Sequence, residues 1–270
     1  SFLDIKGQER PILALQGYLR QDRLQGGLLF VGPQGSGKKL VARTLAKAVN
    51  CEQGQADSCD RCPSCAKIEN NQHPDVHIIG AEDAEVKIES IRQLQRDISL
   101  KPYEARKKIF IIDNAHRISP EASGALLKIL EEPPANSLII LVSDKPNLLF
   151  KTIISRCKTL KFLPLSRARL QDILKQEHGL EASLAHYLAY VAEGRYGKAL
   201  EFKDADMLRE KNAVIDGFVF SRRSGFEQFA KQEKAKIRMD LNTLATWFRD
   251  IYLVKIGRPH SDIIHGDRRD

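Results

Sequence analysis

Short apolar runs alternate with amphipathic segments through the N-terminal part of the chain. A short apolar run bounded by turn residues predicts a buried strand, whereas apolar residues three or four positions apart predict a helix. Strands that alternate with helices are typical of a doubly wound parallel sheet, so we expect an α/β domain over residues 1–164. The predicted strands cover residues 28–31, 76–79, 109–112, 138–142 and 159–162.

The pattern changes at residues 163–165, Leu-Pro-Leu, after which it predicts helices only. The first two of these helices are each followed by glycine, a common residue just beyond a helix end. Lysine and arginine are frequent in this part of the chain, and we interpret residues 165–207 as a small helical lid domain. The predicted helices cover residues 166–178, 182–193 and 197–208.

A last helical segment carries the only tryptophan, Trp247. Leu244, Ile251 and Val254 share one apolar stripe with it at helical spacing. Because the segment is too small to enclose a core of its own, we interpret residues 208–270 as a C-terminal helical (collar) region that is incomplete or depends on a partner.

Composition indicates a globular protein with a basic surface. The chain has 270 residues, 42% of them hydrophobic, with a formal net charge of +8. This charge favours a polyanionic partner but does not separate DNA from RNA or from an acidic protein. No apolar run is long enough to cross a bilayer and the first residues lack the core of a signal peptide, so we expect a cytoplasmic protein.

Four of the five cysteines lie close together, in the spacing C-x7-C-x2-C-x2-C. Two overlapping C-x2-C steps let thiolates converge on one ion, and a cysteine at the end of the preceding helix can complete a tetrahedron. We predict a structural zinc module over residues 51–65, because four thiolates leave no open coordination position. A pair of disulfides is the alternative, which a reducing compartment disfavours. The predicted zinc ligands are Cys51, Cys59, Cys62 and Cys65.

The segment GPQGSGK at residues 32–38 lies between a predicted strand and a predicted helix. Backbone N–H groups of such a loop, with the positive end of the helix dipole, cradle phosphate. The next residue, Lys39, stands where a Ser or Thr hydroxyl would ligate Mg²⁺, and an ammonium has no lone pair for a metal. The sequence therefore gives ATP or ADP binding little support, and a glycine-rich turn without nucleotide is the alternative. The predicted phosphate-binding residues are Gly32, Gly35, Gly37 and Lys38.

A second part of a nucleotide site follows the apolar strand at residues 109–112. Asp113 lies at its carboxyl end, where an open α/β sheet places its ligands, and an acidic residue there usually holds the water shell of Mg²⁺. The next position normally carries a glutamate that activates the attacking water. Here it is Asn114, whose carboxamide cannot accept that proton. An ordinary buried strand with a capping aspartate is the alternative.

Together these motifs resemble the clamp-loader branch of the AAA+ ATPases. The resemblance covers most of the chain up to about Phe162 and extends more loosely over the helical remainder. Its most specific parts are the cysteine spacing and the motifs at residues 123–134 and 155–157. The residues that carry it are GQERP at 7–11, GPQGSGKK at 32–39, the four cysteines, HPDV at 73–76, IFIIDNAH at 109–116, SGALLKILEEPP at 123–134 and SRC at 155–157.

The resemblance implies an AAA+ fold and a subunit of a heteropentameric ring that opens a sliding clamp and places it on primed DNA. Motor subunits of the family have Thr or Ser at position 39 and Glu at position 114, so this chain is expected to be the subunit that does not hydrolyse ATP. The implied partners are gamma/tau-like motor subunits and a delta subunit, and through them the clamp and DNA. The whole would belong to a DNA polymerase III holoenzyme, a DNA-directed DNA polymerase.

The resemblance also implies roles for single residues. Arg156 of the SRC motif would reach the γ-phosphate bound by the neighbouring subunit, as an arginine finger in trans; a surface arginine in a loop is the alternative. Ser143 occupies the position of a γ-phosphate sensor, although a short hydroxyl there could equally cap a loop. Lys198 stands where active members carry the basic sensor of the lid, with a solvated lysine as the alternative. Cys157 is expected to be a small buried side chain.

Two other functions stay open on the sequence. The chain could be an ATP-hydrolysing motor subunit of the same family, or a free zinc-containing DNA-binding protein. ATP hydrolysis by the isolated chain would indicate the motor subunit. Tight DNA binding without partners would indicate the free DNA-binding protein.

Overall fold

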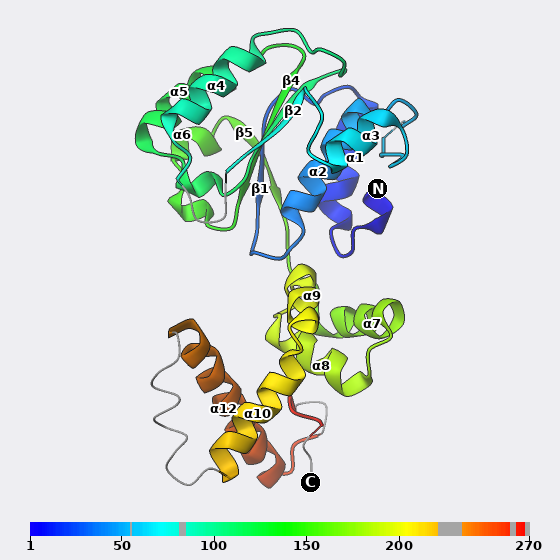
Figure 1. Ribbon diagram of the computed structural model, residues 1–270, viewed down its shortest axis with the longest axis vertical. Coiled ribbons are helices and arrows are strands. Elements are labelled where there is room, and N and C mark those ends of the chain that lie inside the picture. Colours follow the sequence, from blue (N-terminus) through cyan, green and yellow to red (C-terminus); the bar gives the residue numbers. More distant parts are fainter. Residues whose placement is uncertain (55, 81–84, 221–233, 260–262, 268–270) are drawn as a thin grey trace. The chain divides into compact units, whose positions relative to one another are not determined.

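The computed structural model describes residues 1–54, 56–80, 85–220, 234–259 and 263–267. The chain divides into two compact units, Ser1–Leu163 and Pro164–Asp270 (Figure 1). Among the described helices, none is both long and apolar enough to cross a membrane. The predicted division of the chain into an AAA+ domain, a lid and a collar stays a prediction.

The first unit is built on a parallel sheet of five strands in the order β2-β3-β4-β1-β5. Every strand therefore needs a crossover connection, and the amphipathic segments between the apolar runs supply it. The predicted α/β architecture with a parallel sheet is confirmed. The strands are β1 (Gly26–Val31), β2 (Val76–Ile79), β3 (Lys108–Ile112), β4 (Ser137–Ser143) and β5 (Cys157–Lys161).

Helices cover both faces of this sheet (Figure 1). Alternate residues of one strand face opposite sides, so Leu28 and Phe30 of β1 pack in one core and Leu29 and Val31 in the other. The first core is closed by α1 (Glu9–Arg20), α2 (Lys38–Asn50) and α3 (Pro63–Glu69), and the second by α4 (Ile88–Ile98), α5 (Pro120–Glu131) and α6 (Lys151–Ile154). Short 3₁₀ turns complete the unit: η1 (Phe2–Asp4), η2 (Ala115–Arg117) and η3 (Pro146–Leu148).

The edge strand β5 differs from its predicted range, 159–162. It begins at Cys157, which pairs with Gly27 of β1, and it ends at Lys161. Lys158 and Thr159 are exposed although they belong to the ladder. An edge strand with exposed polar residues leaves no apolar run in the sequence, which explains the shift of two residues.

The second unit contains α7 (Arg167–His178), α8 (Ala182–Val191), α9 (Tyr196–Asp204), α10 (Met207–Phe220) and α12 (Lys234–Lys255). Ser166 caps α7 by accepting a hydrogen bond from the Arg169 N–H, and Gly179 ends it in a left-handed conformation. These features confirm the predicted first helix of this part.

The predicted helix over residues 197–208 is wrong in its end. The chain leaves α9 after Asp204, and Asp206 has φ +50°, outside the helical region. The Asp206 carbonyl then accepts from the N–H groups of Arg209 and Glu210, which starts α10. Aspartate tolerates the left-handed conformation better than most residues, so the break needs no glycine or proline to signal it.

The predicted apolar stripe on the last helix is only partly buried. In α12, Leu244 is 8% exposed, but Val254 is 53% exposed. Asp250, which the stripe does not include, is buried and accepts hydrogen bonds from the N–H groups of Ile264 and His265. Residues 221–233, 260–262 and 268–270 of the predicted collar region lie outside the described residues.

Candidate functional site

The loop of residues 32–37 joins β1 to α2 at the carboxyl edge of the sheet. Gly37 caps α2 with φ +85°, a conformation that residues with a Cβ rarely adopt. A Cβ at Gly32 would lie 2.2 Å from the carbonyl oxygen of Phe162, so this position has no room for a side chain. The sequence thus folds into the glycine-rich turn and helix start that a phosphate site requires.

Lys38 is turned back onto its own loop. Its Nζ donates to the carbonyl oxygens of Gly32 and Pro33, each at 2.7 Å, and the residue is only 6% exposed. Burial lowers the pKa of Lys38 to about 8, although Asp144 and Asp113 act in the opposite direction. Two of the three N–H donors of this ammonium are thus used within its own loop, which leaves one for a phosphate.

Lys39 forms an ion pair with the aspartate at the end of β3. Its Nζ lies 2.9 Å from Oδ2 of Asp113, whose side chain is 15% exposed. The structure therefore places an ammonium next to the carboxylate that would hold the water shell of Mg²⁺. A divalent cation at this carboxylate would have to displace the ammonium or bear its repulsion, which at 4 Å is about 4 kcal/mol per unit charge near a protein surface.

Asn114 holds the same carboxylate from the other side. It adopts a left-handed conformation at φ +49° and ψ +44°, and its backbone N–H donates to Oδ1 of Asp113 at 3.0 Å. Both carboxylate oxygens of Asp113 thus have partners within the chain. The carboxamide of Asn114 offers no base for an attacking water.

Ser143 ends β4 on the same edge of the sheet. Its Oγ accepts from the backbone N–H of Lys145 at 3.2 Å and lies 3.4 Å from Nδ1 of His116. His116 also lies 3.3 Å from Oδ1 of Asp144, and burial lowers its pKa. These contacts match the loop-capping alternative for Ser143, and its role as a sensor stays a prediction.

Lys198 lies in α9 of the second unit, half-buried, with Nζ 5.2 Å from the ring centre of Phe202. This contact is a cation–π interaction and gives the side chain a structural partner. The sensor role predicted for Lys198 stays a prediction.

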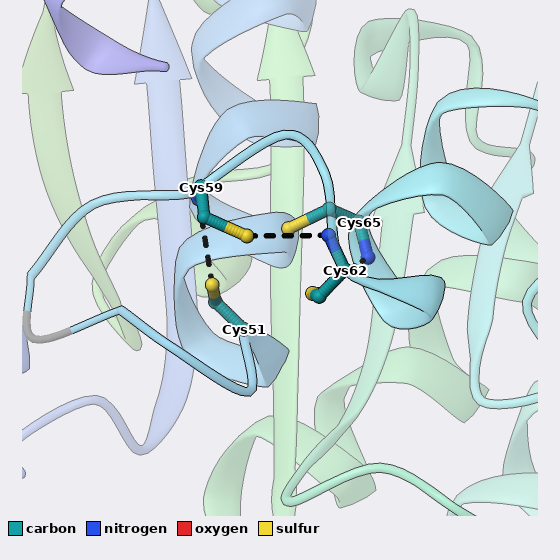
Figure 2. A group of neighbouring side chains, drawn as sticks. All are labelled: Cys51, Cys59, Cys62 and Cys65. Carbon is teal, nitrogen blue, oxygen red and sulfur yellow. Dashed lines mark hydrogen bonds between the residues drawn. The ribbon is translucent and has the colours of Figure 1, made fainter.

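The four cysteines of the predicted zinc module converge in space (Figure 2). Their sulfur atoms all lie within 4.8 Å of one another, and all five cysteines of the chain have free thiols. Four sulfurs about 2.3 Å from one zinc ion in a tetrahedron lie about 3.8 Å apart, so this cluster has the size of such a site. Cys51 follows α2, Cys62 caps α3, and Cys65 lies in its first turn.

Backbone N–H groups point at these sulfurs (Figure 2). Cys59 N–H donates to the Sγ of Cys51 at 3.4 Å, Cys62 N–H to Cys59 at 3.3 Å, and Cys65 N–H to Cys62 at 3.5 Å. Hydrogen bonds from the Arg61 and Cys62 backbones lower the pKa of Cys59 to about 6, whereas burial raises the pKa of Cys65. Such donors favour the thiolate form, which is the form that binds a metal.

Lys47 of α2 forms ion pairs with the cysteine segment and with α3. This role was not predicted from the sequence. Nζ of Lys47 lies 2.6 Å from Asp60 and 2.8 Å from Glu69, with the lysine 6% exposed. Burial opposes the charge, but the hydrogen bonds to both carboxylates raise the pKa of Lys47 above its ordinary value. The available signal was a lysine inside an otherwise apolar helix face, where a charged side chain needs a partner.

Arg156 lies between α6 and β5, and its side chain is 36% exposed. Nε and Nη2 contact Oε1 of Glu131 at 2.8 and 2.6 Å, and Nη1 donates to the carbonyl of Thr152 at 3.1 Å. Cys157, the next residue, is half-buried against the second core, and burial raises its pKa to about 12. Glu131 is the second residue that sequence reasoning missed.

Comparisons with known proteins agree on one group. The profile of the family described as "DNA polymerase III, delta subunit" matches residues 7–166. The DNA polymerase III subunit delta' of Bacillus subtilis is 33% identical over 260 residues, which cover 93% of this chain and 78% of that protein. The DNA polymerase III subunit tau of Escherichia coli is 38% identical over 210 residues, covering 76% of this chain but only 32% of that protein.

Solved structures show the same fold at lower identity. A structure of RuvB from Thermotoga maritima matches with a TM-score of 0.54 and 17% identity, covering 80% of this chain and 66% of the RuvB chain. At this identity the likeness supports the fold alone.

Proposed function

Because this chain belongs to the family of DNA polymerase III delta subunits, as a delta'-like clamp-loader subunit, we propose that it does not hydrolyse ATP itself and supplies an arginine finger to the ATP site of a neighbouring motor subunit. The predicted membership of the clamp-loader family is confirmed. The division of labour between two subunits is the proposal.

The ion pair between Lys39 and Asp113 carries the first half of this proposal. Lysine at position 39 supplies no hydroxyl ligand for Mg²⁺, and its ammonium neutralises the carboxylate that would support the metal. Asn114 in place of a glutamate removes the group that would activate water. Metal and base are lost independently, which argues against a site that only needs a small rearrangement to work.

Arg156 supports the second half. Its guanidinium is always charged, lies at the surface and is borne on the connection into the edge strand β5. Arginine fingers supplied in trans increase the rate of phosphoryl transfer roughly 10³- to 10⁵-fold in other systems. The subunit would then be inert at its own loop and necessary at its partner's site.

The four cysteines fit a structural zinc ion. Four thiolates fill a tetrahedral site and leave no position for water, so the ion would order the segment around it and take no part in a reaction. Gln55 of the predicted module 51–65 lies outside the described residues.

The partners proposed from the delta' and tau relatives are gamma/tau-like motor subunits and a delta subunit in a heteropentamer. The sliding clamp and primed DNA would be reached through that complex, in the cytoplasm. We keep the division into an AAA+ domain (1–164), a lid (165–207) and a collar region (208–270) as part of the proposal.

The experiment is reconstitution with the motor subunits, comparing wild-type protein with Arg156→Ala. The variant is expected to fold and to assemble, because its side chain contacts only exposed groups. ATP turnover by the partners should fall at least about tenfold, since the interaction is made in the transition state. Unchanged turnover in a fully assembled complex would refute the finger role.

An ATP-hydrolysing gamma/tau-like motor is the second candidate, favoured by the 38% identity to subunit tau. Lys39 and Asn114 both argue against it. A free zinc-containing DNA-binding protein is favoured only by the net charge of +8. Tight DNA binding by the isolated chain would support that third function, and binding that requires the partners would support the clamp-loader complex.

A further inference from the structure

The end of α5 and the start of β5 meet through one pair of side chains. Glu131 is the last residue of α5, and its Oε1 accepts from both Nε and Nη2 of Arg156, at 2.8 and 2.6 Å. Two donors on one edge of a planar guanidinium fix its orientation better than a single contact does. The Glu131 side chain is 50% exposed and that of Arg156 36%, so the pair lies at the surface.

Two more contacts hold the other nitrogen. Nη1 donates to the Thr152 carbonyl at 3.1 Å and lies 3.4 Å from Oγ of Ser155, a long contact. An arginine side chain has five N–H donors: one on Nε and two on each terminal nitrogen. Among the described residues, Glu131 and the Thr152 carbonyl use three of them at good distance. One N–H of Nη2 is left, together with one of Nη1 that makes only the long contact.

We propose that Glu131 is a positioning residue for Arg156: it holds the edge formed by Nε and Nη2, so that the N–H groups of Nη1 and Nη2 without a short contact remain for an anionic phosphate oxygen on another subunit. This inference rests on the proposed finger role of Arg156. A flexible arginine loses side-chain entropy when it meets a phosphate, and a guanidinium that is already oriented loses less of it.

Glu131 could also have the opposite effect on turnover, and experiment can distinguish the two. A carboxylate beside the guanidinium could instead weaken its attraction for phosphate, in which case removing Glu131 would raise the partner's turnover. An exposed ion pair has a small electrostatic effect because water screens it. Misplacement of a catalytic group has a larger one. We therefore expect Glu131→Ala to lower kcat of the assembled complex about three- to tenfold, with KM for ATP changed less than twofold.

The experiment is a double-mutant cycle in the reconstituted complex with motor subunits, clamp and primed DNA. It compares wild type, Glu131→Ala, Arg156→Ala and the double variant. If Glu131 acts through Arg156, Glu131→Ala has no further effect once Arg156 is absent. If Glu131 only stabilises the end of α5, the Glu131→Ala substitution lowers turnover to the same extent with Arg156 present and with Arg156→Ala. That result would overturn the inference.

Two further variants provide controls. Glu131→Gln keeps an oxygen that accepts from Nε, so its turnover should lie closer to wild type than that of Glu131→Ala. Glu132→Ala removes the same charge one residue later; Glu132 is exposed and forms no ion pair with the described residues, so its turnover should match wild type. Equal loss in Glu131→Ala and Glu132→Ala would overturn the inference, as would a gain in turnover with Glu131→Ala.

The outcomes also separate this inference from the proposal on which it depends. Unchanged turnover with Arg156→Ala rejects the finger role itself. A fall with Arg156→Ala but none with Glu131→Ala leaves the finger role standing and rejects the positioning role alone.

Discussion

Helix α2 has a candidate site at each end, and the two sites differ in whether their functional groups already have partners within the chain. At its N-terminus, Lys38 is bonded to carbonyls of its own loop and Lys39 to Asp113. At its C-terminus, Cys51 joins three other free thiols within 4.8 Å. One end has the motif of a nucleotide site but its charged groups are already paired. At the other end, the four candidate ligands are cysteine thiols that lie close together and form no disulfides.

This difference shows that a motif has to be judged by what its groups already bind. Glycines and a helix start still form the phosphate loop, because backbone geometry depends on Gly32 and Gly37. In the proposed function, Lys39 and Asn114 remove the ATP chemistry while the fold stays the same. In the cysteine cluster, by contrast, the four thiols that would bind the metal are all present and close together.

The largest expected effect is at the metal end. Cys62→Ser removes one of four ligands, and structural zinc contributes on the order of 10 kcal/mol to the folding of small modules. We expect the purified variant to lose zinc and the 51–65 segment to become sensitive to protease, while the far-ultraviolet circular dichroism of the sheet and helices stays near wild type. Metal analysis and limited proteolysis measure both.

Cys157→Ser is the matched control, because Cys157 packs against the second core, away from the cluster. It should keep one zinc per chain. Wild-type protein purified from zinc-containing medium without bound zinc would contradict the metal site.

A smaller effect is expected at Lys47, which joins α2 to the cysteine segment. Lys47→Met keeps an apolar chain of similar length but leaves Asp60 and Glu69 without their shared ammonium. Because these carboxylates are partly exposed and regain water, the free energy of unfolding should fall by about 1–2 kcal/mol, less than for a fully buried pair. Urea unfolding measures this change.

Lys67→Met gives the comparison for an exposed pair. Lys67 contacts Glu104 at 2.8 Å, but its side chain is 43% exposed. Its loss should cost about 0.5 kcal/mol or less. An equal cost for the two lysines would show that Lys47 does not brace the cysteine segment.

The last expected effect concerns the pH dependence of stability at the N-terminal end of α2. The pKa of Lys38 is about 8 when folded and 10.5 ordinarily, so the unfolded chain binds more protons between these values and this group makes stability rise with pH from about 8 to 10.5. Lys38→Met lacks this contribution. The difference in unfolding free energy, wild type minus variant, should therefore increase by up to about 3 kcal/mol over that window.

Urea unfolding at several pH values measures this difference directly. A difference that stays constant from about pH 7.5 to 10.5 would mean that Lys38 is not held with a lowered pKa, and hence that its ammonium is not confined by the loop.

Sequence patterns predicted the buried parts of the fold well. The buried strands β1, β3 and β4 differ from their predicted ranges by one or two residues at one or both ends. The range predicted for the half-buried edge strand β2, residues 76–79, agrees with the structure. The three buried strands are apolar because both faces are covered, so the signal is strong. The start of the edge strand β5 and the break at Asp206 were missed because exposed polar residues and a left-handed aspartate leave no such pattern.

The candidate site was predictable as a set of residues but not as a set of contacts. The cysteine spacing by itself indicates that the four thiols converge, because short spacings constrain geometry. The sequence also shows that Lys39 replaces a hydroxyl, but its pairing with Asp113 requires two distant segments to meet at the sheet edge. The contact between Glu131 and Arg156 joins exposed residues, for which hydrophobic patterns carry no information.

The central claim is that the N-terminal end of α2 is closed to Mg²⁺-dependent chemistry by Lys39 and its ion pair with Asp113. The most direct measurement is steady-state ATP hydrolysis by the isolated wild-type chain with Mg²⁺, against Lys38→Ala as background. The account predicts equal rates for the two proteins, at the level of contaminating activity. Clear turnover by the wild type that disappears in Lys38→Ala would contradict it.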